Sequence, residues 1–152
     1  MNLELLKNEI VNDPLNRGYL PMTAQQISSS LNNPDRVIRE LVPLWLVKKT
    51  IIEMGKWGTL VIASQSNPTV AIKSLAIDVV SYIDDPSGKF ETLDMDLQST
   101  TTMLGGLVSA GLINQTQLNT VRALANTTKS RAEELSLGFI EEKHVRDARS
   151  LI

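Results

Sequence analysis

The chain contains no cysteine and only two residues each of Trp, Tyr and Phe among its 152 residues. Without cysteine the chain forms no disulfide, thiolate zinc site or cysteine nucleophile. The 15 basic and 17 acidic side chains nearly balance, so the surface as a whole is poorly suited to neutralising phosphates. Hydrophobic residues nevertheless make up 42% of the chain, enough for a folded core. Composition therefore excludes several chemistries and indicates a globular protein without revealing its function.

The sequence also lacks a long uninterrupted apolar run. Its most apolar stretch, residues 70–83, carries Lys73 and Asp78 and is too short to span a bilayer. The first ten residues alternate between apolar and charged side chains, unlike the uncharged centre of a signal peptide. We therefore expect a soluble protein that does not insert into a membrane.

What the sequence does contain is helical periodicity along almost its whole length, beginning with Leu3, Leu6 and Ile10. Three residue pairs have capping-box spacing at predicted helix starts: Thr23 with Gln26, Asn114 with Gln117, and Ser130 with Glu133. Glycines follow three predicted helix ends, at Gly55, Gly111 and Gly138. These signals predict an all-α fold of about seven or eight short helices.

One predicted helix, about residues 68–84, is apolar nearly all round, which is typical of a central, buried helix. Because the predicted connections between helices are short, we expect antiparallel neighbours around it. The sequence thus predicts a single helical domain over residues 1–152, with 84–93 as the one long break. Residues 57–63 fit either a helix or a strand, and we favour a helix because no partner strand is evident.

A search for catalytic or metal-binding groups finds no constellation. His144 is the only histidine, so it has no second imidazole beside it. The acidic segment 84–96 does not match a calcium loop, since Ile83 stands where the pattern needs an acid five residues before Gly88. Gly105-Gly106 lacks the Gly-Lys-Ser/Thr of a phosphate loop and instead favours close helix packing. We therefore predict a protein that is not an enzyme and that uses no metal or cofactor.

Residues 23–41 resemble a helix-turn-helix, with a turn at 32–34 between two short predicted helices. Arg36 and Arg39 would lie on the second helix. Acidic side chains on the same helix oppose phosphate binding, and residues 1–66 hold seven basic against six acidic side chains. A small DNA-binding regulator using residues 23–41 is therefore an alternative, while nucleic acid is not the partner we expect.

Two stretches of the sequence carry distinctive motifs. The first reads DPLxRGYxxMT and then LN, and is carried by Asp13-Pro14-Leu15, Arg17-Gly18-Tyr19, Met22-Thr23 and Leu31-Asn32. The second reads SRAEELGLG…HV…AR and is carried by residues 130–138, His144-Val145 and Ala148-Arg149. Both motifs resemble those of a family of small, poorly characterised tailed-bacteriophage proteins, which usually has glycine at the positions of Asn16 and Ser136.

The resemblance implies a phage structural or interaction protein without enzymatic activity. It further implies association with the virion, in the tail or connector region, through helical surfaces that dock onto other virion proteins. The expected location is the virion, or the host cytoplasm during infection, and the chain is a candidate homo-oligomer such as a ring. A phage effector that binds a host protein is a second alternative.

Four residues are candidates for contacts with a partner: Arg17, Tyr19, Arg36 and Arg39. Arg17 and Tyr19 either anchor the loop that follows Pro14 or present an exposed contact, and we favour anchoring. In the second stretch, Arg131 can pair with either Glu134 or Glu91.

Overall fold

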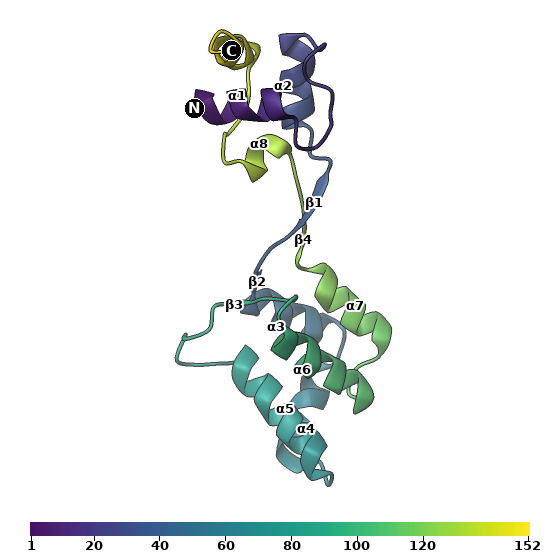
Figure 1. The fold of residues 1–152 in the computed structure, drawn as a ribbon. Helices are drawn as coiled ribbons and strands as arrows, with labels where there is room; N and C mark the ends of the chain where they lie inside the picture. The colour runs from purple at the N-terminus through teal and green to yellow at the C-terminus, as the bar shows by residue number, and fades with distance from the viewer. The chain divides into compact units, whose positions relative to one another are not determined.

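A computed structural model describes residues 1–152 and shows a mostly α-helical protein, with nine helices that contain 57% of the residues (Figure 1). The helix-rich prediction is confirmed, but the fold is not strictly all-α. Four short strands form two two-stranded sheets, one pairing β1 (Arg36–Arg39) with β4 (Asn126–Lys129) and the other pairing β2 (Val42–Pro43) with β3 (Thr92–Leu93).

The residue contacts divide the chain into two compact units. Unit 1 contains Met1–Ile38 and Thr128–Ile152, and unit 2 contains Arg39–Thr127. Both ends of the chain thus belong to unit 1, and unit 2 is a single continuous segment between them. The single helical domain predicted over residues 1–152 stays a prediction beside this division into two units.

Unit 1 is built from four helices: α1 (Leu3–Asn12), α2 (Ala24–Asn32), α8 (Arg131–Glu134) and α9 (Glu142–Arg149). Helix α9 packs against both α1 and α2, and α8 packs against α2. The apolar stripe that predicts α1 supplies Leu6 and Ile10 to the core, where both are fully buried. The remaining core residues come from both ends of the chain: Tyr19, Ile27, Leu31, Ala132, Leu137, Ile140, Val145 and Ala148.

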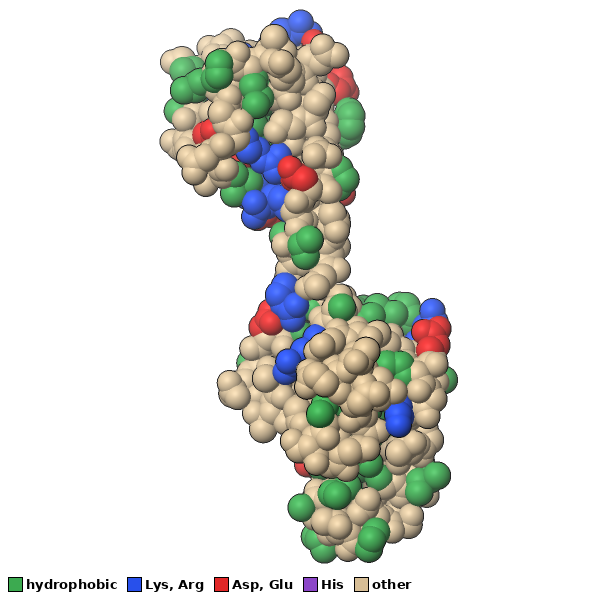
Figure 2. All heavy atoms as spheres, turned by 90° about the vertical axis from the view of Figure 1, so that its right-hand side faces the viewer, with side chains coloured by type: hydrophobic (Ala, Val, Ile, Leu, Met, Phe, Trp, Pro, Cys, Tyr) green, Lys and Arg blue, Asp and Glu red, His purple; other side chains and the backbone are tan.

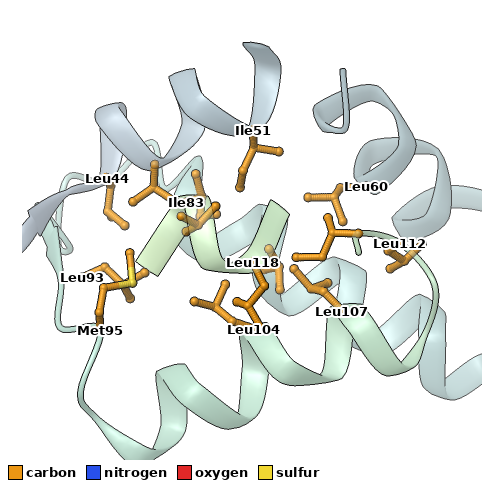
Figure 3. Packing of buried hydrophobic residues seen from close by; sticks show 14 of the residues in the cluster. Leu44, Ile51, Leu60, Ile83, Leu93, Met95, Leu104, Leu107, Leu112 and Leu118 are labelled. Carbon is orange, nitrogen blue, oxygen red and sulfur yellow. The ribbon is translucent and has the colours of Figure 1, made fainter. Parts of the chain in front are cut away.

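Unit 2 has five helices, α3 (Leu44–Glu53), α4 (Trp57–Ser66), α5 (Val70–Ile83), α6 (Gln98–Ser109) and α7 (Gln115–Ala123). Their inward side chains form a separate, aliphatic core in which Leu60, Leu104 and Leu107 are almost fully buried (Figure 3). The strands β2 and β3 are antiparallel, with Val42 opposite Leu93 and Pro43 opposite Thr92. The helix favoured for residues 57–63 is confirmed as part of α4.

The helix starts follow the predicted caps. Thr23, Asn114 and Ser130 each accept a hydrogen bond from the backbone N–H three residues later, and each forms a full capping box. Because a capping box satisfies two backbone N–H groups that the helix itself cannot, it fixes where the helix begins. At the end of α6, Gly111 has φ 69°, the left-handed conformation predicted for it.

The helix-turn-helix predicted over residues 23–41 is wrong in its second helix. After α2, residues Arg36–Arg39 form strand β1 instead. Val37 and Ile38 are β-branched, which favours extended backbone, and β4 supplies a pairing partner. Strand pairing therefore replaces the helix predicted after the turn at 32–34, and Arg36 and Arg39 do not lie on a recognition helix.

The apolar segment predicted as a central helix is indeed a helix, but it is not buried all round. Along α5, Ala76, Val79 and Ile83 are buried, whereas Val70 and Ile77 are 78% and 42% exposed. Helices α4 and α5 pack along each other as a hairpin, and α5 also packs against α6. Gly106 on α6 allows that approach, because a Cβ there would lie 3.1 Å from the Leu75 side chain.

Candidate functional site

The residues of the two sequence motifs come together in unit 1, where Asp13 organises the loop after α1. Asp13 has φ 40°, and its carboxylate accepts hydrogen bonds from the backbone N–H of Arg17 at 2.7 Å and of Gly18 at 2.6 Å. Such side-chain capping of following N–H groups is what makes aspartate a turn residue. The loop is therefore held in one conformation by its own first residue.

Arg17 fastens this loop to the end of α2. Its Nη1 donates to the carbonyl oxygen of Ser30 at 2.6 Å, and its Nη2 donates to Asp35 Oδ1 at 2.7 Å. The Arg17 side chain is only 13% exposed. The guanidinium is thus engaged within unit 1, as the anchoring interpretation expects.

Tyr19 is fully buried in the core of unit 1, and its hydroxyl has no hydrogen-bond partner. Its backbone carbonyl accepts a hydrogen bond from Arg149 Nη2 at 2.9 Å, which ties the loop to α9. Burial raises the pKa of the Tyr19 phenol to about 12. Tyr19 therefore acts as a core residue whose ionisation is strongly disfavoured.

The raised pKa of Tyr19 predicts a loss of stability at high pH. The folded chain holds the phenolic proton more tightly than the unfolded chain, whose pKa is 10.0. The stabilisation is present below pH 10 and disappears as the pH rises to about 12, a difference of about 3 kcal/mol. We expect the free energy of unfolding of Tyr19→Phe, measured by urea unfolding, to fall less steeply across that pH range than that of the native chain. Tyr82→Phe is the control, and an equally steep loss of stability in Tyr19→Phe would contradict the prediction.

A line of alternating charges connects α1, α8 and β1 within unit 1. Arg131 donates to both carboxylate oxygens of Glu9, at 2.9 and 2.7 Å, and its Nη1 lies 3.0 Å from Glu134. Arg36 Nε lies 2.7 Å from the same Glu134 carboxylate. Of the two alternative partners that the sequence offers for Arg131, Glu134 is confirmed, and the guanidinium is shared between Glu134 and Glu9.

The Glu9–Arg131 pair is the most buried ion pair among these charges. The side chain of Glu9 is 3% exposed and that of Arg131 is 13% exposed. The hydrogen bond to Glu9 raises the pKa of Arg131. Burial acts to raise the pKa of Glu134, but hydrogen bonds and charges from Arg131 and Arg36 lower it. Arg131 and Glu134 are therefore held in their charged forms.

Asn32 joins the end of α2 to the segment before α9, and His144 caps the start of α9. The Asn32 side-chain amide donates to the carbonyl of Ile140 at 2.7 Å and accepts from its N–H at 2.9 Å. His144 Nδ1 accepts from the Glu141 N–H at 3.1 Å and so closes a capping box at the start of α9. The only histidine of the chain thus has a local structural contact.

The four candidates for partner contacts are divided between the two units. Arg17, Tyr19 and Arg36 lie in unit 1, whereas Arg39 lies in unit 2. Arg39 Nε lies 2.8 and 2.7 Å from the two oxygens of Asp96, and its Nη1 donates to Asn126 at 2.8 Å. Each of the three arginines is thus already paired within the chain.

The structure contains no group of three or more His, Asp or Glu side chains placed to hold a metal ion. None of its helices combines the length and the apolar character needed to cross a membrane.

Two exposed surfaces remain without an internal role. The first, which we term the hairpin face, consists of Ile62, Val70 and Ile77 on α4 and α5, whose exposed fractions are 63%, 78% and 42%. Figure 2 shows hydrophobic side chains at the end of unit 2 that holds this hairpin. The second is an open groove of about 910 Å³ in unit 1, beside Phe139. Sequence reasoning missed both, although the scarcity of charge in the hairpin is visible in the sequence.

Comparisons of the chain with protein-family models, with curated proteins and with solved structures found no match.

Proposed function

We propose that the chain is a non-enzymatic structural protein that assembles with a second copy of itself through the hairpin face. One observation carries this proposal: three branched aliphatic side chains are exposed on a hairpin that is almost free of charge. From Trp57 to Ile83 the only charged residues are Lys73 and Asp78. Exposed apolar surface of this kind favours burial against a protein partner.

The absence of net charge favours a second copy as that partner. A two-fold interface brings the same surface of both copies together, so a net charge on that surface would be repelled by the same charge on the other copy. Lys73 and Asp78 cancel, and the three exposed aliphatic residues carry no charge. Helical hairpins that meet in this way form a four-helix arrangement, a common way of burying such faces.

Assembly also accounts for the apolar character of α5 around its whole circumference. Within one chain, Val70 and Ile77 face solvent. In the proposed dimer these residues would be buried, and α5, about 21 Å long at 1.5 Å per residue, would become the central apolar helix that the sequence predicts.

Self-association is tested by sedimentation velocity of the full chain over a range of concentrations. We expect a dimer or larger closed assembly for the native chain and a folded monomer for Ile77→Glu, because the glutamate would be buried without a partner. Leu97→Glu, which places the same charge on an exposed leucine outside the hairpin, is the control. A native chain that stays monomeric at all concentrations, or an Ile77→Glu chain that still assembles, would rule out this interface.

The phage context of the proposal is supported by the two motifs. Residues of the two motifs, which are far apart in sequence, contact one another in unit 1, because Arg149 donates to the carbonyl oxygen of Tyr19. On this basis we assign the chain a virion-associated role in the tail or connector region, with other virion proteins as further partners. Mass spectrometry of purified phage particles tests the assignment, and particles without the chain would refute it.

A further inference from the structure

The groove in unit 1 centres on Phe139, whose side chain is 76% exposed. Phe139 lines the cavity of about 910 Å³ and also an adjoining cavity of about 400 Å³. Asn32 and Pro34 line both cavities as well, so the two form one groove on either side of the ring. A partner entering the groove would therefore meet an aromatic face at its centre.

The exposure of Phe139 is imposed by its neighbours. Leu137 and Ile140, on either side of the Gly138-Phe139 pair, are 6% and 1% exposed and belong to the core of unit 1. Gly138 has φ 71°, a conformation that a side chain would strain, and Asn32 holds the backbone of Ile140. With both flanking residues fixed in the core, the ring is held outward on a firmly anchored turn.

The charged side chains that line the groove are all acidic. Glu133, Glu141 and Glu142 are the charged residues along its two cavities, and no Lys or Arg lines either cavity. A hydrogen bond from the Ser130 N–H lowers the pKa of Glu133, and one from Lys143 lowers the pKa of Glu141. The Glu133 and Glu141 carboxylates are thus ionised at neutral pH.

We infer that this groove binds a basic segment of a partner protein, with an Arg or Lys side chain over the Phe139 ring. A cation within about 6 Å of an aromatic centroid is attracted to the face of the ring. Carboxylates along the groove would pair with the same cation and its neighbours. An acidic segment or a nucleic-acid backbone would be repelled by these carboxylates, and an uncharged segment would gain no charge pairing in the groove.

Selection from a random peptide library displayed on yeast, with the full chain as bait, tests this inference. The expected peptides are enriched in Arg or Lys next to an apolar residue, and a selected peptide should bind more weakly at high salt. Phe139→Ala should weaken its binding by about tenfold or more, and Glu133→Gln together with Glu142→Gln should do the same.

Leu20→Ala is the matched control, because Leu20 is a 68% exposed apolar residue of unit 1 outside the groove. Circular dichroism of each variant shows that the chain remains folded. Selected peptides no more basic than the starting library, or unchanged affinity for Phe139→Ala, would overturn the inference. Neither outcome depends on the hairpin face, so this experiment tests peptide binding independently of the proposed self-association.

Discussion

Replacing Arg131 with methionine is expected to lower the free energy of unfolding by about 3–5 kcal/mol. The Glu9 carboxylate, 3% exposed, receives two hydrogen bonds from Arg131, at 2.9 and 2.7 Å. Without Arg131 this carboxylate would remain buried with no opposite charge, a far larger penalty than the loss of the pair itself. Urea unfolding followed by far-UV circular dichroism measures the difference.

Arg146→Met is the control for that measurement. The Arg146 side chain is 67% exposed and lies 3.8 Å from Glu142, so its loss should change stability by no more than about 0.5 kcal/mol. The double variant Glu9→Leu with Arg131→Met should regain most of the loss, because it removes the buried charge altogether. Equal effects of Arg131→Met and Arg146→Met would show that burial of Glu9 is not the cause.

Replacing Asn32 with alanine is expected to lower the free energy of unfolding by about 3 kcal/mol, the second largest effect that we predict. The Asn32 amide satisfies both the N–H and the carbonyl of Ile140, a residue that is 1% exposed. Alanine would leave two buried backbone groups without partners, and each such group costs about 1–3 kcal/mol. Thermal and urea unfolding should both show the loss.

Asn33→Ala, at the exposed neighbouring position, should change stability by less than about 0.5 kcal/mol. Asn32→Asp keeps the acceptor for the Ile140 N–H but loses the donor to its carbonyl, so we expect an intermediate stability. If Asn32→Ala were no worse than Asn33→Ala, the bridge to Ile140 would contribute nothing to the fold.

The helix starts could be predicted because the chemistry that sets them is local. A capping box needs only two residues three positions apart, as in Thr23 with Gln26, and both appear in the sequence. The strands could not be predicted in the same way. Strand β1 depends on pairing with β4, whose residues Asn126–Lys129 include two threonines that favour strands but no apolar residues whose alternation would mark a strand.

The contacts of unit 1 were only partly visible in the sequence. Glu9 lies three residues after Leu6, at the edge of the apolar stripe of α1, and an acid at such a position signals a buried partner. That partner, Arg131, is distant in sequence and could not be identified from spacing. Asn16 and Ser136, at which the proposed resemblance leads us to expect glycine, have φ 52° and 55°, a conformation that glycine adopts freely.

The discontinuous chain path of unit 1 has a consequence for synthesis on the ribosome. Residues 39–127 contain everything that unit 2 needs, so its core can close while the last helices are still unmade. Unit 1 must wait for residues 128–152, about 1–5 s at 5–20 residues per second. During that interval the apolar faces of α1 and α2 lack α8 and α9, which makes the nascent N-terminus the segment most in need of protection by a chaperone.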